Sequence, residues 1–213
     1  MNTHIIGLVG RKQSGKDTVF RMIRELGIDA YRAAFADALK CEVYDELRRG
    51  GMPVVALLLE DGQPLTSPPE GDATTIEKVM WIDQRKDQFR HVLQCYGTDY
   101  RRRFFGDRYW IDRAAETIYS LRGQCEVIVV TDVRFPNEAS YIKECGGTVI
   151  RIDRWPGLWA WLKRKLLPEH KSECVERIAV DYVIKNNGTL GDLREWVRNI
   201  LTLIQVKAER PGN

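Results

Sequence analysis

The feature that most constrains this chain is a glycine-rich segment near its start, which lies between an apolar run and an amphipathic segment. Residues Gly10 to Lys16 read GRKQSGK and fit the pattern G-x-x-x-x-G-K. The preceding run, His4 to Val9, predicts a buried strand, and residues 18–26 carry apolar side chains on one helical face up to Gly27. Because this pattern is meaningful only between a strand and a helix, its context here predicts a loop that wraps backbone N–H groups around a phosphate.

The chemistry of this loop favours the triphosphate of a nucleotide such as ATP. Glycines let the backbone curl so that several N–H groups point at one anion, and the helix that follows adds its positive end. Lys16 supplies a cation for the β- and γ-phosphates. A Ser or Thr commonly follows this lysine, whereas here Asp17 and then Thr18 follow. The carboxylate of Asp17 suits Mg²⁺ and Thr18 suits the α-phosphate, while the alternative is a turn capped by Asp17 without a nucleotide. The residues predicted to contact ATP are Gly10, Gln13, Ser14, Gly15, Lys16, Asp17 and Thr18.

Further along the chain, short apolar runs alternate with amphipathic segments. This alternation predicts an α/β fold with a mostly parallel central sheet flanked by helices, and ligands beyond the carboxyl ends of the strands. With 213 residues we expect one domain, with an inserted arm over about 49–86 whose first part, 49–76, is rich in Gly and Pro. We expect one helix to end at Gly97. The further predicted strands are 30–34, 126–130, 148–152 and 182–184, and the further helices are 36–47, 87–96, 110–121, 137–145 and 190–206.

Composition narrows the range of partners. The 33 basic and 30 acidic residues give a net charge of +3, which suits a protein that handles small polyanions better than one that binds nucleic acid stably. The five cysteines are widely spaced without a C-x-x-C pair, which argues against a disulfide framework or a zinc site. The start of the chain is unlike a signal peptide and no apolar run spans a membrane, so we expect a cytoplasmic protein without a membrane partner. The composition is also compatible with a homodimer.

Four more motifs follow the phosphate loop in order along the chain. Together with Gly15 to Thr18, they resemble the phage-type deoxynucleoside monophosphate kinases from the first strand to the last helix, except across residues 49–76. The resemblance implies the P-loop nucleoside monophosphate kinase fold, and transfer of the γ-phosphoryl group of ATP to a deoxynucleoside monophosphate with Mg²⁺. The motifs are Gln94-x-x-Gly97-Thr98-Asp99, Asp107 to Trp110, Thr131 to Glu138, and Asn186 to Leu190.

The resemblance assigns several cations to the acceptor monophosphate. Lys12, inside the loop, would face both donor and acceptor phosphates and offset their repulsion, and its alternative is an exposed, solvated lysine. Lys40 aligns with a residue near the bound monophosphate, and its alternative is a solvent-facing helix lysine. Arg90 would grip the phosphate, or else form a surface ion pair with Asp87 or Asp83.

Other acceptor contacts would come from the same region of the chain. Gln94 lies four residues after Arg90, on the same helical face, and its amide suits the edge of a base. Trp110 would stack on the base or the sugar, with a core aromatic as the equal alternative. The complete acceptor set is Lys12, Lys40, Arg90, Gln94, Thr98, Arg108, Trp110 and Glu173.

The remaining assignments concern catalysis. Asp132, just after a strand, would act on Mg²⁺ or the acceptor, and Arg134 would hold phosphate, with a turn pair between the two as the alternative. Residues 151–173 resemble the family's lid, in which Arg154 would neutralise migrating charge, although the tryptophans at 155, 159 and 161 also suit a partner or membrane-surface contact. Asn187 would lie under the adenine, in a turn that Thr189 also suits as an N-cap. The catalytic set is Lys16, Asp132, Arg134 and Arg154, and the metal set is Asp17 and Asp132.

Two other functions stay open. Phosphomevalonate and dephospho-coenzyme A kinases have related loops, so another small-molecule P-loop kinase is the first alternative. The second is a nucleotide-binding module that uses ATP as a switch, with Arg101 to Arg103 or the tryptophan-rich segment contacting nucleic acid or a partner.

Overall fold

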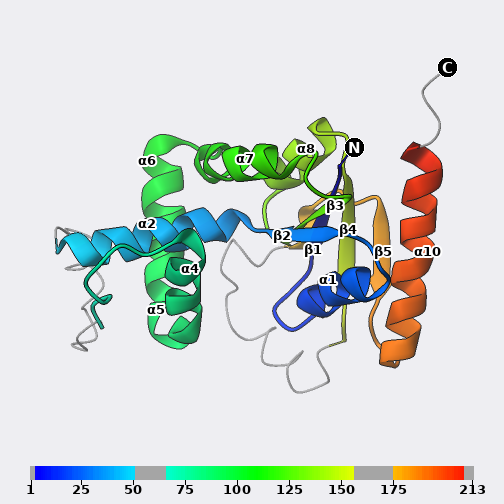
Figure 1. Ribbon diagram of the computed structural model, residues 1–213, viewed down its shortest axis with the longest axis horizontal. Helices are drawn as coiled ribbons and strands as arrows, with labels where there is room; N and C mark the ends of the chain where they lie inside the picture. Colours follow the sequence, from blue (N-terminus) through cyan, green and yellow to red (C-terminus); the bar gives the residue numbers. More distant parts are fainter. Residues whose placement is uncertain (1–2, 51–65, 156–174, 209–213) are drawn as a thin grey trace. The chain divides into compact units, whose positions relative to one another are not determined.

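The computed structural model, drawn in Figure 1, describes residues 3–50, 66–155 and 175–208. The chain folds into two compact units. The first, which we call the sheet unit, combines Met1–Ala34 with Thr117–Asn213. The second, the helical unit, is the intervening stretch Phe35–Glu116. Among the described residues, no helix combines the length and the hydropathy that crossing a membrane requires.

The sheet unit is built on five strands in the order β2-β3-β1-β4-β5. All of the described strand pairs are parallel, so the carboxyl ends of the strands meet at one edge of the sheet. β1 is central, which places the loop that follows it in the middle of that edge. This arrangement confirms the predicted α/β fold. The strands are β1 (His4–Val9), β2 (Ala30–Ala33), β3 (Val127–Val133), β4 (Thr148–Asp153) and β5 (Tyr182–Lys185).

Helices cover both faces of the sheet. Ile6 and Leu8 of β1 lie in one buried cluster with residues of α1 (Lys16–Glu25) and α10 (Leu190–Ala208). Gly7 faces the other way, toward α8 (Pro136–Glu144), because a Cβ atom built on it would lie 2.5 Å from Cδ1 of Ile142. In Figure 1, α10 runs beside β5 at one end of the sheet. The alternation along β1 therefore fills two cores, one on each face.

The helical unit has an aromatic core of its own. Tyr44, Ile82, Phe89 and Tyr96 are almost completely buried, and Trp110 packs with them. Ile82 belongs to α4, so the part of the predicted 49–86 arm from residue 66 onward contributes to this core, and residues 51–65 lie outside the described residues. The elements are α2 (Phe35–Arg49), α4 (Thr75–Gln84), α5 (Lys86–Gln94), the π-helix η1 (Cys95–Arg102), α6 (Arg103–Phe105) and the first part of α7 (Tyr109–Leu121).

The predicted helix end at Gly97 is wrong. Gly97 lies inside η1, which continues the helix of α5 to Arg102. Its lack of a side chain has a packing cause instead, because a Cβ atom there would lie 2.9 Å from Cδ2 of Leu39. The carbonyl oxygen of Gly97 also accepts a 2.9 Å hydrogen bond from Nε1 of Trp110. A glycine that indicated a helix end from the sequence is therefore a contact point between helices.

Candidate functional site

The loop between β1 and α1 has the backbone geometry of a tight anion-binding turn. The N–H of Ser14 donates to the carbonyl oxygen of Arg11 at 3.1 Å, which closes the turn. Gln13 and Gly15 have φ angles of 63° and 107°, in the left-handed region where glycine is favoured. Gly15 is the N-cap of α1, and its carbonyl accepts the N–H of Val19 at 2.9 Å. The loop thus delivers the chain directly to the positive end of a helix.

Gly10 lets this loop lie tightly against the sheet. A Cβ atom on Gly10 would lie 2.5 Å from Oγ of Ser14 and 2.8 Å from the carbonyl oxygen of Ile152, in β4. Ser14 is buried, and among the described residues its Oγ has no hydrogen-bond partner. A side chain at position 10 would therefore push the turn away from the strands that support it.

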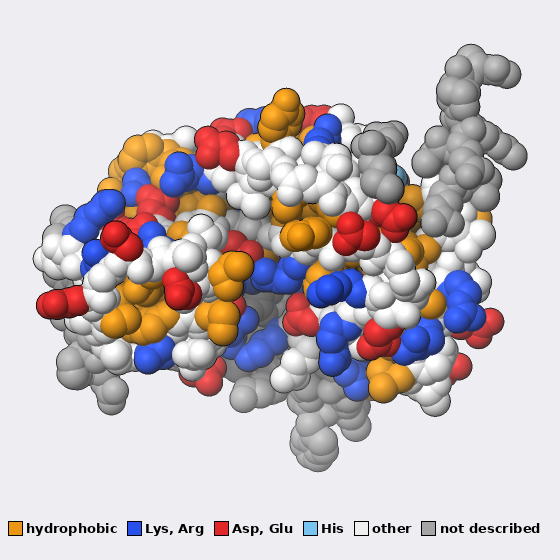
Figure 2. Space-filling view, in the orientation of Figure 1, with side chains coloured by type: hydrophobic (Ala, Val, Ile, Leu, Met, Phe, Trp, Pro, Cys, Tyr) orange, Lys and Arg blue, Asp and Glu red, His pale blue; other side chains and the backbone are white. Residues whose placement is uncertain are grey.

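Positive charge collects at this loop. Nζ of Lys16 donates to the carbonyl oxygens of Gly10 (2.6 Å) and Arg11 (2.9 Å), so its ammonium group lies across the loop. Asp17 is exposed and Thr18 partly exposed in the first turn of α1, and Lys12 is exposed. Figure 2 shows lysine and arginine side chains gathered over α1. The predicted ATP contacts from Gly10 to Thr18 are thus brought together in one loop and helix start.

Asp132 and Arg134 stand at the neighbouring strand end. Val9 pairs with Val133, so the end of β3 lies beside the start of the phosphate loop, with Asp132 partly exposed. The turn after β3 is held by Glu138, whose buried carboxylate accepts the N–H groups of Arg134 (2.7 Å) and the residue after it (3.1 Å). The side chain of Arg134 is exposed. This arrangement leaves a carboxylate and a cation at the ligand-binding edge of the sheet.

The turn after β5 contacts both the phosphate loop and the end of β4. Nδ2 of Asn186 donates to the carbonyl oxygen of Ser14 at 2.8 Å, and its backbone N–H donates to the carbonyl oxygen of Asp153 at 2.7 Å. Oδ1 of Asn187 accepts the N–H of Trp155 at 2.7 Å. Sequence reasoning assigned a role to Asn187 and none to Asn186. The available signal was topological, since both residues follow a strand whose end lies at the same edge.

The structure confirms the N-cap role that the sequence predicts for Thr189 at the start of α10. Its Oγ1 accepts the N–H of Asp192 at 3.2 Å, and Oδ2 of Asp192 accepts the N–H of Thr189 at 2.7 Å. These hydrogen bonds lower the pKa of the Asp192 carboxyl. The cap fixes where α10 begins, and with it the position of the asparagine turn.

The outer side of the phosphate loop is tied to the short helix η3 (Val175–Arg177). Nε of Arg11 donates to Oε1 of Glu176 at 3.0 Å. Burial alone would raise the pKa of Glu176, but the hydrogen bond and positive charge of Arg11 outweigh it and lower the pKa. In the predicted lid, Arg151 belongs to β4 and Arg154 is exposed just after it. Residues 156–174, which include the predicted acceptor residue Glu173, lie outside the described residues.

The cations of the helical unit are largely engaged with carboxylates. Lys40 is buried, and its Nζ lies 2.8 Å from Asp83 and 3.5 Å from Asp37, so the solvent-facing alternative is wrong, while its contact with the monophosphate stays a prediction. Arg90 makes the alternative contact, a loose 3.9 Å ion pair with Asp87.

The other predicted acceptor residues occupy α5, η1 and the turn before α7. Gln94 and Thr98 are partly exposed on the continuous helix of α5 and η1. Arg108 is exposed, 3.8 Å from Asp112. Trp110 is only 3% exposed and donates to a main-chain carbonyl, so the structure gives it the core role of its two alternatives.

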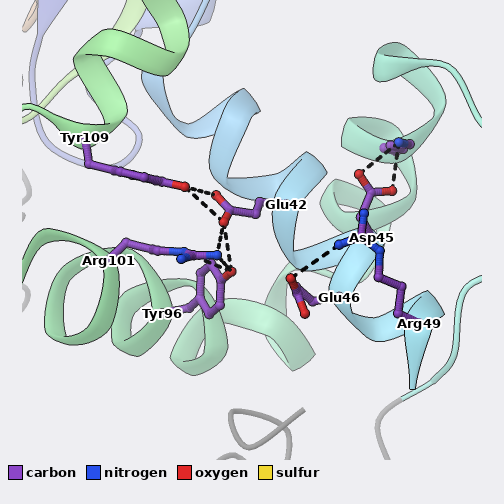
Figure 3. A network of polar contacts seen from close by, with 8 residues as sticks. Glu42, Asp45, Glu46, Arg49, Tyr96, Arg101 and Tyr109 are labelled. Carbon is purple, nitrogen blue, oxygen red and sulfur yellow. Dashed lines mark hydrogen bonds and ion pairs between the residues drawn. The ribbon is translucent and has the colours of Figure 1, made fainter. Parts of the chain in front are cut away.

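A polar network that the sequence did not predict joins α2 to η1 and α7 (Figure 3). Glu42 accepts hydrogen bonds from the hydroxyls of Tyr96 (3.1 Å) and Tyr109 (3.0 Å) and forms an ion pair with Arg101. The guanidinium of Arg101 also lies over the rings of Tyr96, Tyr100 and Tyr109 at 5.1–5.4 Å. Burial, and then the charge of Glu42, raise the pKa of both Tyr96 and Tyr109, so both phenols stay protonated donors.

Comparison with known proteins gives consistent results along the chain. A family model described as deoxynucleotide monophosphate kinase matches residues 66–197. A protein of Acanthamoeba polyphaga mimivirus, provisionally named a deoxynucleotide monophosphate kinase, is 31% identical over 203 residues, which cover 87% of this chain and 90% of that protein.

Solved structures with low sequence identity also match. Dephospho-CoA kinase from Campylobacter jejuni is 15% identical with a TM-score of 0.48, over 95% of this chain and 97% of that one. Shikimate kinase from Aquifex aeolicus is 20% identical with a TM-score of 0.41, over 96% and 98% of the two chains.

Proposed function

The chain belongs to the deoxynucleotide monophosphate kinase family of phosphotransferases, and from that premise we propose that it transfers the γ-phosphoryl group of ATP to a deoxynucleoside monophosphate. The products are the deoxynucleoside diphosphate and ADP. The observation that carries the choice of donor is the loop in which Gly15, at φ 107°, caps α1 and Lys16 lies across the turn. A loop of this kind suits the β- and γ-phosphates of a nucleoside triphosphate.

The proposed reaction needs no nucleophile from the protein. An oxygen of the acceptor phosphate, already ionised, attacks the γ-phosphorus while the bond to the bridging β–γ oxygen breaks and ADP leaves with the electron pair. The task of the protein is positioning and charge neutralisation. The N–H groups of the loop orient the triphosphate, and the ammonium of Lys16 follows the charge that develops on the bridging oxygen. Arg134 and Arg154, both exposed next to strand ends, offer further positive charge.

The carboxylates present suit a magnesium ion that is shared with the nucleotide. Mg²⁺, when bound, neutralises charge on the β- and γ-phosphates. Within the described ranges, no group of three or more acidic, His or Cys side chains is arranged to hold a metal by itself. Mg²⁺ commonly takes one or two carboxylates from a protein and completes its shell with water and phosphate oxygens. Asp17, in the first turn of α1, and Asp132, near the end of β3, are the ligands that we propose.

For the acceptor we propose Arg90, Gln94 and Thr98 of the helical unit as the main contacts. They lie four residues apart along the continuous helix of α5 and η1, and all three are at least partly exposed. Spacing by four places them on one face, where a guanidinium suits a phosphate and an amide suits a base edge. The ion pair of Arg90 with Asp87 is long, at 3.9 Å, and can be exchanged for a phosphate.

The proposal is tested by measuring ADP release from ATP and Mg²⁺ with each deoxynucleoside and ribonucleoside monophosphate. At least one deoxynucleotide should stimulate ADP release. Lys16→Ala should lower kcat/KM by about 10²- to 10³-fold without changing the circular dichroism spectrum, because a charge at the phosphates is lost. Arg21→Ala, which removes an exposed cation from the same helix, is the matched control and should change turnover less than about twofold. Wild-type turnover in Lys16→Ala, or no stimulation by any monophosphate, would refute the proposal.

A further inference from the structure

The side chain of Asn186 makes a direct contact with the phosphate loop. Its Nδ2 donates to the carbonyl oxygen of Ser14 at 2.8 Å across 172 positions of sequence. The backbone of Asn186 is itself fixed, because its N–H donates to the carbonyl oxygen of Asp153 at 2.7 Å. The donor therefore reaches the loop from a rigid base at the end of two adjacent strands.

The bond from Asn186 determines the direction of a loop N–H group. In a planar trans peptide, the carbonyl oxygen and the N–H group point in opposite directions. Holding the carbonyl of Ser14 toward Asn186 therefore directs the N–H of Gly15 to the opposite side of the loop. The next peptide is fixed independently, since the carbonyl of Gly15 accepts the first hydrogen bond of α1, from Val19. Two consecutive N–H groups, at Gly15 and Lys16, are thereby oriented by two named bonds.

Close packing against Asn186 also accounts for the glycine at position 15. A Cβ atom on Gly15 would lie 2.5 Å from Nδ2 of Asn186, well inside contact distance. Its φ of 107° disfavours a side chain for a separate reason. The neighbouring Asn187 does not share this role, because its Oδ1 accepts the N–H of Trp155. The contact is thus specific to one of the two asparagines.

We propose that Asn186 is a positioning residue, whose amide holds the Ser14–Gly15 peptide so that the N–H of Gly15 faces the phosphates of ATP. The inference rests on the proposed function, since it supposes that the loop binds ATP. It adds to that function a residue that touches the loop and not the nucleotide. Its loss should weaken the binding of ATP and leave the acceptor site as it was.

Two substitutions at position 186 test the role of the amide. Asn186→Ala removes the donor and should raise the dissociation constant of a non-hydrolysable ATP mimic about tenfold. The reason is that the hydrogen bond that orients the N–H of Gly15 toward the charged phosphates is lost. Asn186→Asp keeps the shape but turns a carboxylate oxygen toward the carbonyl of Ser14, so its effect should be larger. Asn199→Asp, at an exposed position of α10, makes the same chemical change away from the loop and should leave binding unchanged.

The readouts separate positioning from general stability. In steady-state assays, KM for ATP should rise in Asn186→Ala while KM for the acceptor stays the same. In the protein without nucleotide, the NMR amide signal of Gly15 should shift, and signals from α10 should not. The increase in KM for ATP that Gly15→Ala causes should be smaller, by about threefold or more, in the Asn186→Ala background than in the wild type. The reason is that the 2.5 Å contact between the new Cβ atom and Nδ2 of Asn186 is gone.

The outcomes divide clearly. Calorimetry on the wild type comes first, and failure to bind ATP there would overturn the proposed function and this inference together. If the wild type binds ATP and both variants at position 186 bind it equally well, only the inference is overturned. A parallel rise in both KM values with a lowered melting temperature would also overturn it, as a general loss of structure. If Asn186→Ala does not fold, Asn186→Asp, which preserves the side-chain shape, decides.

Discussion

The substitution Gly10→Ala isolates the packing of the phosphate loop against the sheet. The new Cβ atom would lie 2.8 Å from the carbonyl oxygen of Ile152, compared with an ordinary contact of about 3.5 Å, so the loop must move by roughly 0.5–1 Å. A misplacement of about 1 Å at a reacting centre can cost about 10²-fold in rate. We therefore expect kcat/KM to fall about 100-fold, which corresponds to about 2.7 kcal/mol of lost transition-state stabilisation. Overpacking should also lower the free energy of unfolding by about 1–3 kcal/mol.

The assay compares ADP release and ATP affinity in Gly10→Ala with two further variants. Gly191→Ala is the matched control, because the nearest described atom to its Cβ would be Oγ1 of Thr189 at 3.4 Å. It lies in the first turn of α10, where alanine should stabilise by about 0.5–1 kcal/mol and leave turnover unchanged. The double variant with Ser14→Ala removes the 2.5 Å contact with Oγ and leaves the one with Ile152, so it should restore activity only in part.

One result would refute this reasoning. If Gly10→Ala keeps the wild-type kcat/KM and ATP affinity, then the loop accommodates a methyl group without moving, and the contact with β4 does not set its position. Full recovery in the double variant would refute a narrower claim, namely that the main chain of Ile152 is the fixed obstacle.

Two predictions concern stability. Burial lowers the pKa of His4, whose ring shares a 3.0 Å hydrogen bond with Thr148. The contribution of neutral His4 to the free energy of unfolding is therefore present above the ordinary pKa of 6.5 and is lost as the pH falls toward the lowered pKa. The melting temperature should therefore fall more steeply below pH 6.5 in the wild type than in His4→Asn, and parallel curves would contradict this. Glu42→Ala should lower the free energy of unfolding, measured in urea, by about 2–4 kcal/mol, because it leaves the charge of Arg101 without its carboxylate partner. Tyr109→Phe removes one hydrogen bond and should lower it by about 1 kcal/mol. Equal losses in the two variants would count against an electrostatic role of the network.

The sheet unit could be predicted from the sequence because its signals are local. Short β-branched runs such as the one from Val127 to Val130 indicate buried strands, and Gly10 to Lys16 marks the loop between β1 and α1. The helical unit was harder, because its boundaries depend on contacts between helices. Gly97 has the local character of a helix end, yet its role is set by Leu39, 58 positions earlier by number, which no periodicity reveals.

The same limit explains which parts of the candidate site were missed. Loop contacts from Gly10 to Thr18 are contiguous and could be named directly. Asn186 meets Ser14 only because the ends of β1, β4 and β5 converge, and Glu42 meets Arg101 only because two helices cross. A sequence pattern indicates that a residue is polar and near a strand end, but a three-dimensional arrangement decides what it contacts. Lys40 illustrates this, since no sequence pattern indicated its burial or its ion pair with Asp83.

The hydrogen bonds at Trp155 and Glu176 have a consequence for how relatives of this enzyme can diverge. One residue joins the asparagine turn and the other joins Arg11, so the chain is anchored on both sides of residues 156–174. Substitution of Asn187 or Arg11 in a relative would therefore remove one of these two anchors.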